Sequence, residues 1–427
     1  MSQRNNSSAA RRRREASAVP EPRRVRPVQK RKPENKKMTR GHGASRPANR
    51  GIRVKPAKAP IGSMDYTFLM LVLVLVTVGL IMMFSASYPA ALNATGDSFY
   101  FIKRQLVFAI VGVAAMFVAS RVPFQVLHRF ALLLYGVSIV LLIIVLLLPE
   151  QSGVHRWITI PGVISFQPSE IAKFSIVVLF AHLISINYEK MKDPRYGIAP
   201  FMVLLGIVCF LMILEPHLSG TILIIGIGII MMFVGGTDIK WFFMGGLALA
   251  VLVAIVALLP GIIPYAQTRL NFWLDPWSAP RNEGYQTCQS LLAIGSGGLF
   301  GVGIGNSRQK HLYLPEPQND FVFSIVCEEL GLVGAVLIIL VFVLLVWRGY
   351  VIAMRCRDRF GSMLAVGLIT QVAIQTILNI AVVTNTIPNT GISLPFFSYG
   401  GTSLIMLLGQ MGFILSVSRQ TTLEKLE

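Results

Sequence analysis

The sequence predicts an all-α polytopic membrane protein with about ten transmembrane helices and a large extracellular loop between helices 7 and 8. Hydrophobic residues make up 54% of the 427-residue chain and charged residues only 14%, whereas soluble domains carry about 25% charged residues. The mean hydropathy is +0.63. Ten apolar segments approach the ~20 residues with which a helix crosses a bilayer. This composition excludes a soluble globular enzyme.

The ten apolar segments are expected to be helices. In lipid every backbone amide and carbonyl must be hydrogen-bonded within the chain, and the strands of a membrane barrel would instead alternate over about 10 residues. The segments lie at 65–86, 104–120, 130–148, 169–187, 199–214, 218–235, 241–260, 321–347, 361–384 and 401–417.

Positive charge in the connecting loops orients these helices, because short cytoplasmic loops are enriched in Lys and Arg. With both termini in the cytoplasm, the short outer loops hold only Lys103, Arg104 and Arg156. We therefore expect a multi-pass membrane protein whose long loop faces outward. The inner loops and the C-terminal segment hold Arg121, Arg129, Lys190, Lys192, Arg195, Lys240, Arg348, Arg355, Arg357, Arg359, Arg419 and Lys425.

A basic tail, residues 1–60, precedes the membrane core at 61–420. It holds 19 of the 39 Lys and Arg against three acids, and so carries +16 of the net charge of +19. It has too few large apolar residues to fold, so we expect a disordered cytoplasmic tail. Anionic lipid is the expected partner, with docking to a protein as the alternative; no nucleic acid is expected, because no aromatic residues are interleaved. The outer loop spans 261–320, and 421–427 form a cytoplasmic C-terminus.

The first candidate site lies at the start of the eighth helix. Asp320, Ser324 and Glu328 are four residues apart and share one helix face, which carries polar groups about 12 Å into the membrane. Polar groups at this depth are costly and indicate function. Glu316 precedes them, and Lys310 adds positive charge. The alternative is that Asp320 merely caps the helix; in either case the helix N-terminus is expected to lower its pKa.

The second candidate site surrounds the start of the fourth helix. Arg156 lies before this helix. The stretch 167–173, where the helix begins, contains Gln167, Ser169, Glu170 and Lys173. The spacing allows Glu170 and Lys173 to neutralise each other. These residues form either a cationic lining for an anionic lipid headgroup or a structural ion pair at a helix end.

The third candidate is the segment GISLPFFSYGGTS at 391–403, with Ser398 and Gly400. Its glycines and proline suit a broken segment with close backbone approach. A phosphate-binding turn and a simple loop turn both explain the pattern.

These motifs closely resemble the SEDS family (shape, elongation, division and sporulation), the FtsW and RodA group of bacteria, and division-type members are favoured over elongation and sporulation types. With ten predicted spans, the resemblance covers nearly the whole chain after residue 60. The matching stretches are Gln167–Glu170 with Lys173, Gly284–Gln286 with Gln289 and Ser290, Ala293–Gly298, Gly303–Lys310, Leu314–Phe321, Glu328–Gly331 and Leu394–Gly401. One departure is His217, where family members often carry Asp.

The resemblance implies a peptidoglycan glycosyltransferase that polymerises lipid II, an undecaprenyl-pyrophosphate-linked disaccharide-pentapeptide, on the outer face of the bacterial inner membrane during cell division, at the septum. It implies that Asp320 is essential and adds Gln286, Ser290 and Ser296 to the candidate substrate contacts. It also implies a class B penicillin-binding protein transpeptidase and other division proteins as partners. The resemblance also implies a divalent cation, Mg²⁺ or Mn²⁺, although the residues themselves indicate no cation site.

Our mechanistic hypothesis makes Asp320 a general base for the acceptor hydroxyl or a ligand of a metal ion. The leaving pyrophosphate needs cations, which Arg156, Lys173 or Lys310 could supply. Two rival functions are a lipid II flippase or transporter, which needs a polar path through both leaflets, and a non-catalytic scaffold for division proteins.

Overall fold

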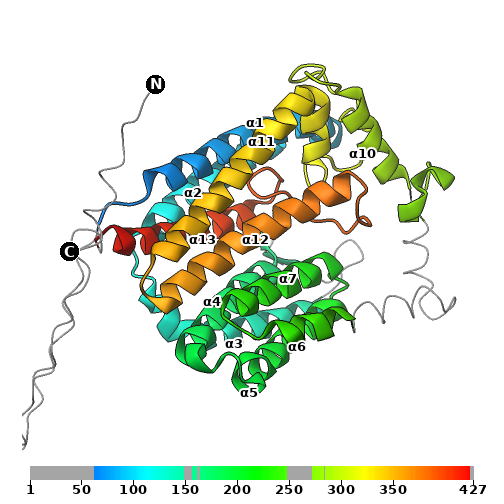
Figure 1. The fold of residues 1–427 in the computed structure, drawn as a ribbon. Coiled ribbons are helices and arrows are strands. Elements are labelled where there is room, and N and C mark those ends of the chain that lie inside the picture. The colour runs from blue at the N-terminus through cyan, green and yellow to red at the C-terminus, as the bar shows by residue number, and fades with distance from the viewer. Residues whose placement is uncertain (1–61, 149–155, 161–163, 248–271, 283, 424–427) are drawn as a thin grey trace, which may run out of the picture. The chain divides into compact units, whose positions relative to one another are not determined.

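The computed structural model describes residues 62–148, 156–160, 164–247, 272–282 and 284–423 (Figure 1). Within these ranges the chain is helical apart from loops and one two-stranded antiparallel sheet. The elements are α1 (Tyr66–Thr95), α2 (Tyr100–Ala119), α3 (Gln125–Leu147), β1 (Ile158–Ile160), β2 (Ile164–Phe166), α4 (Pro168–Asn187), η1 (Tyr188–Lys190), α5 (Pro194–Gly197), α6 (Ala199–Leu214), α7 (Leu218–Val234), η2 (Pro276–Ser278), α10 (Tyr285–Ser296), α11 (Val322–Arg355), α12 (Arg359–Val383) and α13 (Gly401–Leu423).

Eight of the described helices are long and apolar enough to cross a membrane, and α7 is a shorter apolar helix. The predicted class, an all-α polytopic membrane protein, is therefore confirmed. Nine of the ten predicted segments coincide with these helices within a few residues at most ends. The remaining segment, 241–260, lies largely outside the described residues, as do the tail at 1–60, the start of the predicted outer loop at 261–271 and residues 424–427 of the C-terminal segment.

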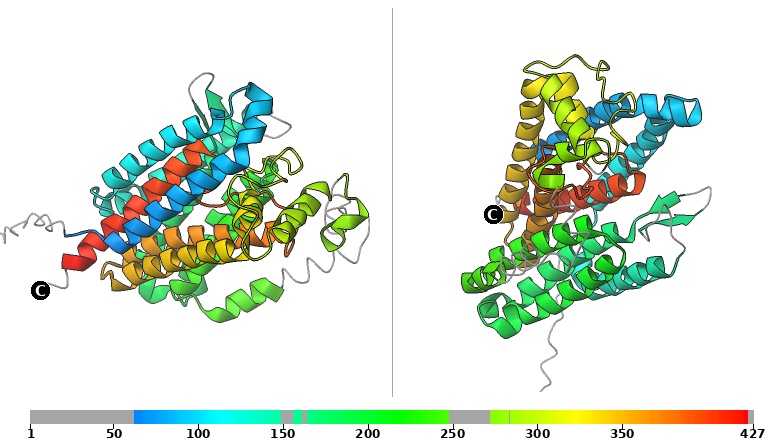
Figure 2. Two further views of the ribbon diagram at one scale, coloured as in Figure 1. Left: turned by 90° about the horizontal axis from the view of Figure 1, so that it is seen from above. Right: turned by 90° about the vertical axis from the view of Figure 1, so that its right-hand side faces the viewer.

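The most deeply buried spans are α4, α12 and α13. α4 packs against α3, α7 and α12, while α11 packs against α1 and α12. α13 lies along α2, as both the ribbon from above and its contacts indicate (Figure 2). Because these helices alternate in direction, their ends meet at two opposite ends of the bundle. We call the end where α1 finishes and α2, α4, α7 and α13 begin the site end.

Local sequence signals account for several helix boundaries. The Asp65 carboxylate accepts a hydrogen bond from the amide of Phe68, 2.9 Å away, which is the usual way that an Asp side chain starts a helix. At the other end of α1, Gly96 adopts a left-handed conformation and its amide binds the Leu92 carbonyl, a common helix stop. Pro168 occupies the first turn of α4, where its missing amide hydrogen has no helical partner to lose.

The eighth predicted helix is not one continuous rod. α11 is interrupted at Gly331, whose φ of 67° and ψ of −170° are non-helical. Its first segment, Val322–Leu330, therefore lies at an angle to the long segment that follows (Figure 1). Ser324 and Glu328 lie in this short segment, whereas Asp320 precedes the helix, so the expectation that the three residues share one helix face is wrong for Asp320.

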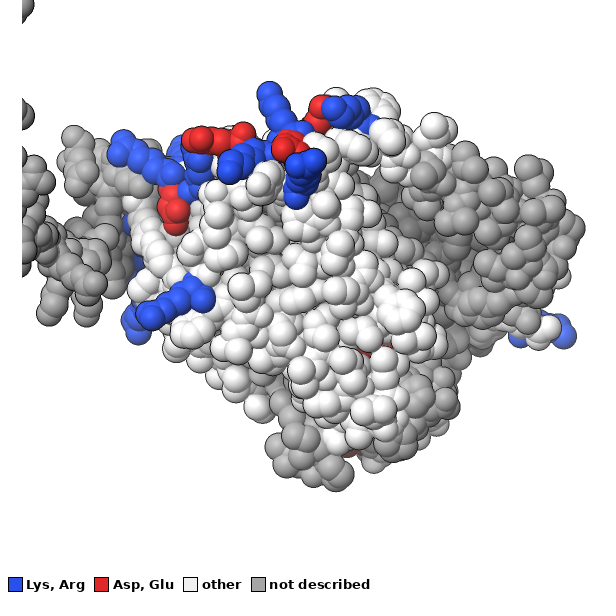
Figure 3. Space-filling model, turned by 90° about the horizontal axis from the view of Figure 1, so that it is seen from below, with Lys and Arg blue, Asp and Glu red and all other residues white. Residues whose placement is uncertain are grey.

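Charged side chains are unevenly distributed over the surface. In the view from below, Lys and Arg gather mainly along one edge of the visible face, together with a few acids, and most of the remaining described surface is uncharged (Figure 3). Large exposed side chains of the spanning helices, such as Leu132, Phe210 and Val343, are apolar. Such a surface suits contact with lipid.

Candidate active site

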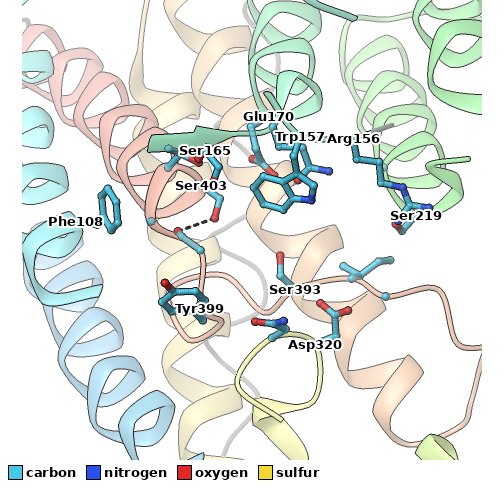
Figure 4. Close-up of a pocket in the computed structure, with 18 of the residues that line it drawn as sticks. Phe108, Arg156, Trp157, Ser165, Glu170, Ser219, Asp320, Ser393, Tyr399 and Ser403 are labelled. Carbon is cyan, nitrogen blue, oxygen red and sulfur yellow. Dashed lines mark hydrogen bonds between the residues drawn. The ribbon is translucent and has the colours of Figure 1, made fainter. Parts of the chain in front are cut away.

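A polar cavity of about 960 Å³ opens at the site end of the bundle (Figure 4). It is lined by the first turns of α2, α4 and α7, by the β1–β2 region, and by the loops that precede α11 and α13. Most lining residues lie in a loop or within two turns of a helix end, while α2 contributes Phe108 and α12 contributes Gln375 from further inside. The cavity therefore lies near the membrane surface of the site end.

Asp320 lies in this cavity beside Ser393 (Figure 4). The residue is half-buried, and within the described part of the chain its carboxylate has no hydrogen-bond or ion-pair partner. One carboxylate oxygen would lie 3.2 Å from a Cβ built on Gly391, which has a φ of 67°. Helix α11 starts after Phe321, and no side chain caps it. The alternative that Asp320 caps the helix is therefore wrong.

The environment of Asp320 raises its pKa to about 6, because burial disfavours the charged carboxylate. The nearby Glu316 carboxylate raises this pKa further, while the Arg156 guanidinium acts in the opposite direction. The predicted lowering of this pKa is wrong, since no side chain caps α11 and burial and Glu316 outweigh Arg156.

Helix α12 holds the backbone around Asp320. The side-chain amide of Asn379, which is fully buried, donates hydrogen bonds to the carbonyls of Asp320 at 2.7 Å and Ile392 at 2.6 Å. One turn earlier, Gln375 donates to the carbonyl and hydroxyl of Ser393 at 3.0 and 3.1 Å. These two amides join α12 to both loops that form the floor of the cavity.

The wall formed by α4 and α7 is cationic. Lys173 is 4% exposed and forms an ion pair with Glu170 at 2.7 Å. Arg156 donates from its guanidinium to the carbonyls of Glu215 and Pro216, at the turn between α6 and α7. This confirms that the spacing of Glu170 and Lys173 produces a helix-end ion pair, and the same pair lines the cavity.

Two titratable neighbours of Arg156, Glu215 and His217, are neutral near pH 7. Burial raises the pKa of Glu215 to about 8. Burial, together with the positive charges of Arg156 and Lys173, lowers the pKa of His217 to about 3. The His217 ring lies 3.4 Å from the Gln167 amide nitrogen. At this position, where SEDS family members often carry Asp, the chain therefore places a neutral ring in the cavity.

A second group of cations lies on the opposite wall, at the start of α2. The guanidinium of Arg104 stacks on the Tyr100 ring at 4.4 Å, and it opposes the rise that burial causes in the pKa of Tyr399. Lys103 pairs with Asp97 at 2.8 Å. Figure 4 shows Phe108 and Tyr399 on this side of the cavity and Arg156 on the other.

The structure brings seven of the fifteen predicted site residues together in the cavity, and the functional roles of all fifteen stay predictions. The seven are Arg156, Gln167, Glu170, Lys173, Glu316, Asp320 and Gly400. The other eight do not line it: Ser169, Gln286, Ser290, Ser296, Lys310, Ser324, Glu328 and Ser398.

Most of these eight have protein partners instead. The hydroxyls of Ser290 and Ser324 lie 2.7 Å apart, and Ser290 also donates to the Val383 carbonyl. The Gln286 oxygen accepts from Asn389, the Ser296 hydroxyl donates within its own helix, and the Ser398 hydroxyl accepts from the amide of Leu394. Buried polar groups need such partners. Lys310 and Glu328 are buried and paired, whereas the buried Ser169 hydroxyl has no partner among the described residues.

Sequence reasoning missed several polar residues of the cavity. Ser219 and Gln375 were not among the candidates, and Lys103 and Arg104 were noted only as outer-loop charges. The third candidate segment, 391–403, contains Ser393, Tyr399, Thr402 and Ser403 but did not single them out. A signal existed for Gln375, because Gln371, Gln375 and Asn379 recur every four residues along an otherwise apolar helix and so form a polar stripe. Ser219 carries no comparable signal, since only folding brings it to the cavity. The glycines and proline of 391–403 marked the segment that holds Ser393 and Tyr399, but not those side chains.

The fold and the cavity define an integral membrane protein with a charged site near one membrane surface. A sequence profile of the FtsW/RodA/SpoVE family, described as cell cycle protein, matches residues 65–423. The chain belongs to this family.

Curated relatives support the same assignment. Stage V sporulation protein E of Bacillus subtilis is 42% identical over 361 residues, covering 84% of this chain and 97% of that protein. A protein of Geobacter metallireducens named probable peptidoglycan glycosyltransferase FtsW is 38% identical over 357 residues, covering 83% of this chain and 94% of that protein.

Two solved structures share the fold. One chain of a peptidoglycan synthase complex, described as coordinating polymerization and crosslinking, has a TM-score of 0.70 and 27% identity, and the match covers 84% of this chain and 98% of that one. The rod shape determining protein RodA of Thermus thermophilus has a TM-score of 0.62 and 27% identity, covering 84% and 97%.

Proposed function

We propose that this chain is a peptidoglycan glycosyltransferase that polymerises lipid II on the outer face of a bacterial cytoplasmic membrane. The observation that carries the proposal is the unpaired carboxylate of Asp320, half-buried in a cavity that also holds Arg156 and Lys173. Such a pairing of one base with fixed cations suits the displacement of a phosphate leaving group. Relatives named as peptidoglycan glycosyltransferases support the reaction class.

The reaction begins when the 4-hydroxyl of the acceptor sugar attacks the anomeric carbon of the pyrophosphate-linked donor. Asp320 accepts the hydroxyl proton, a role that contributes about 10²–10⁴-fold. Its pKa of about 6 makes it a stronger base than an ordinary Asp while leaving it mostly ionised at neutral pH. As the glycosidic bond forms, the sugar–phosphate bond breaks, and Arg156 and Lys173 stabilise the departing pyrophosphate.

A divalent cation fits the carboxylate side of the cavity. Among the described residues no group of three or more His, Cys, Asp and Glu could hold a metal alone, but Glu316 lies close enough to Asp320 to raise its pKa. Proteins commonly hold Mg²⁺ through one or two carboxylates plus substrate phosphates. As the alternative to the base role, we propose that Asp320 and Glu316 would hold Mg²⁺ or Mn²⁺, which would neutralise pyrophosphate charge. In that case removal with EDTA should reduce polymerisation and added Mg²⁺ should restore it.

The positive-inside rule supports an outward-facing site end, because Lys and Arg of the short loops concentrate at the other end. The likeness to one chain of a peptidoglycan synthase complex that couples polymerization to crosslinking supports a transpeptidase partner of the class B penicillin-binding type. Relatives include both FtsW and a sporulation protein. We further propose that the chain acts at the division septum together with other division proteins.

Purified Asp320→Asn chain, supplied with fluorescent lipid II in detergent or nanodiscs, tests the catalytic claim. Glycan formation should fall by about 10²–10⁴-fold, while lipid II binding should persist. The matched control is Asp238→Asn, which makes the same change at a carboxylate of the opposite end of the bundle, paired with Lys240 and outside the cavity. Near-normal polymer from Asp320→Asn would end the claim that this carboxylate is the base.

The same preparation separates the enzyme from a flippase. The cavity opens at the site end, and its charged lining is contributed by residues of that end, which favours surface chemistry over a path through both leaflets. In liposomes that carry lipid II, the chain should form polymer without moving lipid II between leaflets. Translocation without polymer would favour the transporter.

A further inference from the structure

A buried ionic cluster lies outside the cavity. It consists of Ser85, Ser307, Lys310, Glu328 and Glu329, and we call it the carboxylate latch. None of the five residues is more than 5% exposed, and Lys310 is fully buried. Charges so deeply buried are retained only when they are paired and hydrogen-bonded, and none of these residues lines the cavity.

Glu329 is the centre of the latch. Its carboxylate forms an ion pair with Lys310 at 2.7 Å and accepts hydrogen bonds from the Ser85 hydroxyl at 2.8 and 2.7 Å. The Lys310 ammonium also lies 3.2 Å from the Ser85 hydroxyl and 4.8 Å from the centre of the Tyr88 ring. The latch thereby joins α1, the loop that contains Lys310, and the first segment of α11.

Glu328 binds the backbone of the same loop. Its carboxylate accepts from the amides of Arg308 at 2.9 Å and Gln309 at 3.4 Å, and from the Ser307 hydroxyl. The amide of Ser307 lies 3.4 Å from the Glu329 carboxylate. Three successive amides therefore point at two adjacent carboxylates, which occupy this turn as a bound anion would.

The latch closes the loop that carries Asp320. We define the Asp320 loop as residues 306–321; it leaves the latch and returns to the short helix that bears Glu328 and Glu329. Its far end is held separately, because the amide of Tyr399 donates to the Gln318 carbonyl at 2.8 Å and Asn379 donates to the Asp320 carbonyl. Both ends of the loop are thus anchored, and Lys310 belongs to the anchor that is remote from the cavity.

We propose that Lys310 is a positioning residue: paired with Glu329, it holds the Asp320 loop on α1 and α11 and so fixes the Asp320 carboxylate in the cavity. This replaces the expectation that Lys310 supplies charge to the leaving pyrophosphate. The inference rests on the proposed function, in which Asp320 is the base. It assigns a mechanical role to a pair that touches neither substrate nor reacting atoms.

Charge balance makes the role testable. Removing one partner of a buried ion pair leaves an uncompensated charge, whereas replacing both partners by neutral groups of similar size is often tolerated. Lys310→Met should therefore lower kcat by about 100-fold, the typical effect of a displaced catalytic group, with little change in KM. The double variant Lys310→Met/Glu329→Gln should recover most of this kcat. Arg308→Met removes an exposed cation from the same loop and should leave kcat unchanged.

Two kinetic results would overturn the positioning role of Lys310. If Lys310 stabilised the departing pyrophosphate directly, Lys310→Met would also lower kcat, but neutralising Glu329 in the double variant would restore nothing. If the pair only stabilised the fold, monodisperse Lys310→Met protein would keep wild-type kcat and lose only thermal stability. Either result removes the positioning role.

Backbone hydrogen exchange of the full chain in nanodiscs provides a readout that needs no activity. Lys310→Met should speed exchange in residues 307–320 but not in α6 or α13, and the double variant should restore protection. Unchanged exchange in 307–320, or faster exchange throughout the chain, overturns the latch. If the wild-type chain fails to polymerise lipid II, the proposed function is wrong. The exchange result still shows whether the pair of Lys310 and Glu329 holds the Asp320 loop in place.

Discussion

Asp320 is held in surroundings that oppose its negative charge, and this determines how activity should vary with pH. Burial raises its pKa to about 6, and only the ionised carboxylate can accept a proton. We therefore expect kcat/KM to rise with pH, reach half its plateau near pH 6, and fall about tenfold per pH unit below that. Initial rates of lipid II polymerisation across this range measure the profile.

The pH profile of kcat/KM should change when a group that raises the pKa of Asp320 is removed. Glu316 raises the pKa of Asp320, so Glu316→Gln should shift the acidic limb to lower pH. A wild-type profile that stays flat through pH 6 contradicts the assignment of Asp320 as base.

Asn379 is a second residue whose role follows from its contacts. Asn379→Leu keeps the branched shape of the side chain but leaves the carbonyls of Asp320 and Ile392 without a donor. An unsatisfied buried group costs about 1–3 kcal/mol, and the loosened backbone should also lower kcat. Thermal unfolding and polymerisation rates measure the two effects.

The control for Asn379 lies one turn earlier on the same helix. The buried hydroxyl of Thr376 has no hydrogen-bond partner in the described residues, so Thr376→Val should change stability and kcat little. Equal losses in both variants would show that any polar change in α12 is disruptive.

At the level of elements, the break in α11 depends on Gly331. Its φ of 67° and ψ of −170° belong to a region that essentially only glycine occupies, where strain costs about 1–3 kcal/mol. A Cβ there would also lie 2.3 Å from the amide nitrogen of Gly301. Gly331→Ala should therefore lower both the melting temperature and kcat, because the segment before the break carries Glu328 and Glu329.

Gly206 provides the matched comparison. It lies inside α6, and a Cβ there meets nothing within 4 Å. Gly206→Ala should be neutral or stabilising by up to about 1 kcal/mol. If Gly331→Ala were equally harmless, the break would not require glycine.

The helices could be predicted from sequence because a long apolar segment in lipid satisfies its backbone hydrogen bonds only by forming a helix. The break at Gly331 could not, since Val322–Leu330 and the segment after it are both apolar enough to read as one span. Arg156, Glu170, Lys173 and Asp320 were found because charge near a span is conspicuous. Lys310 and Glu328 were equally conspicuous but do not line the cavity, because sequence records a charge and not the partner that it meets in the fold.

For the whole molecule, the proposed chemistry requires the site end to face outward. Asn93, in the last turn of α1, and Lys192, in the loop after α4, are exposed at opposite ends of the bundle. In a chain with Cys356→Ser, which removes the half-buried cysteine, Asn93→Cys should react with a membrane-impermeant maleimide on intact spheroplasts. Lys192→Cys should react only after permeabilisation. The reverse pattern would place Asp320 on the cytoplasmic side, away from a substrate presented outside, and the polymerase proposal would fail with the topology.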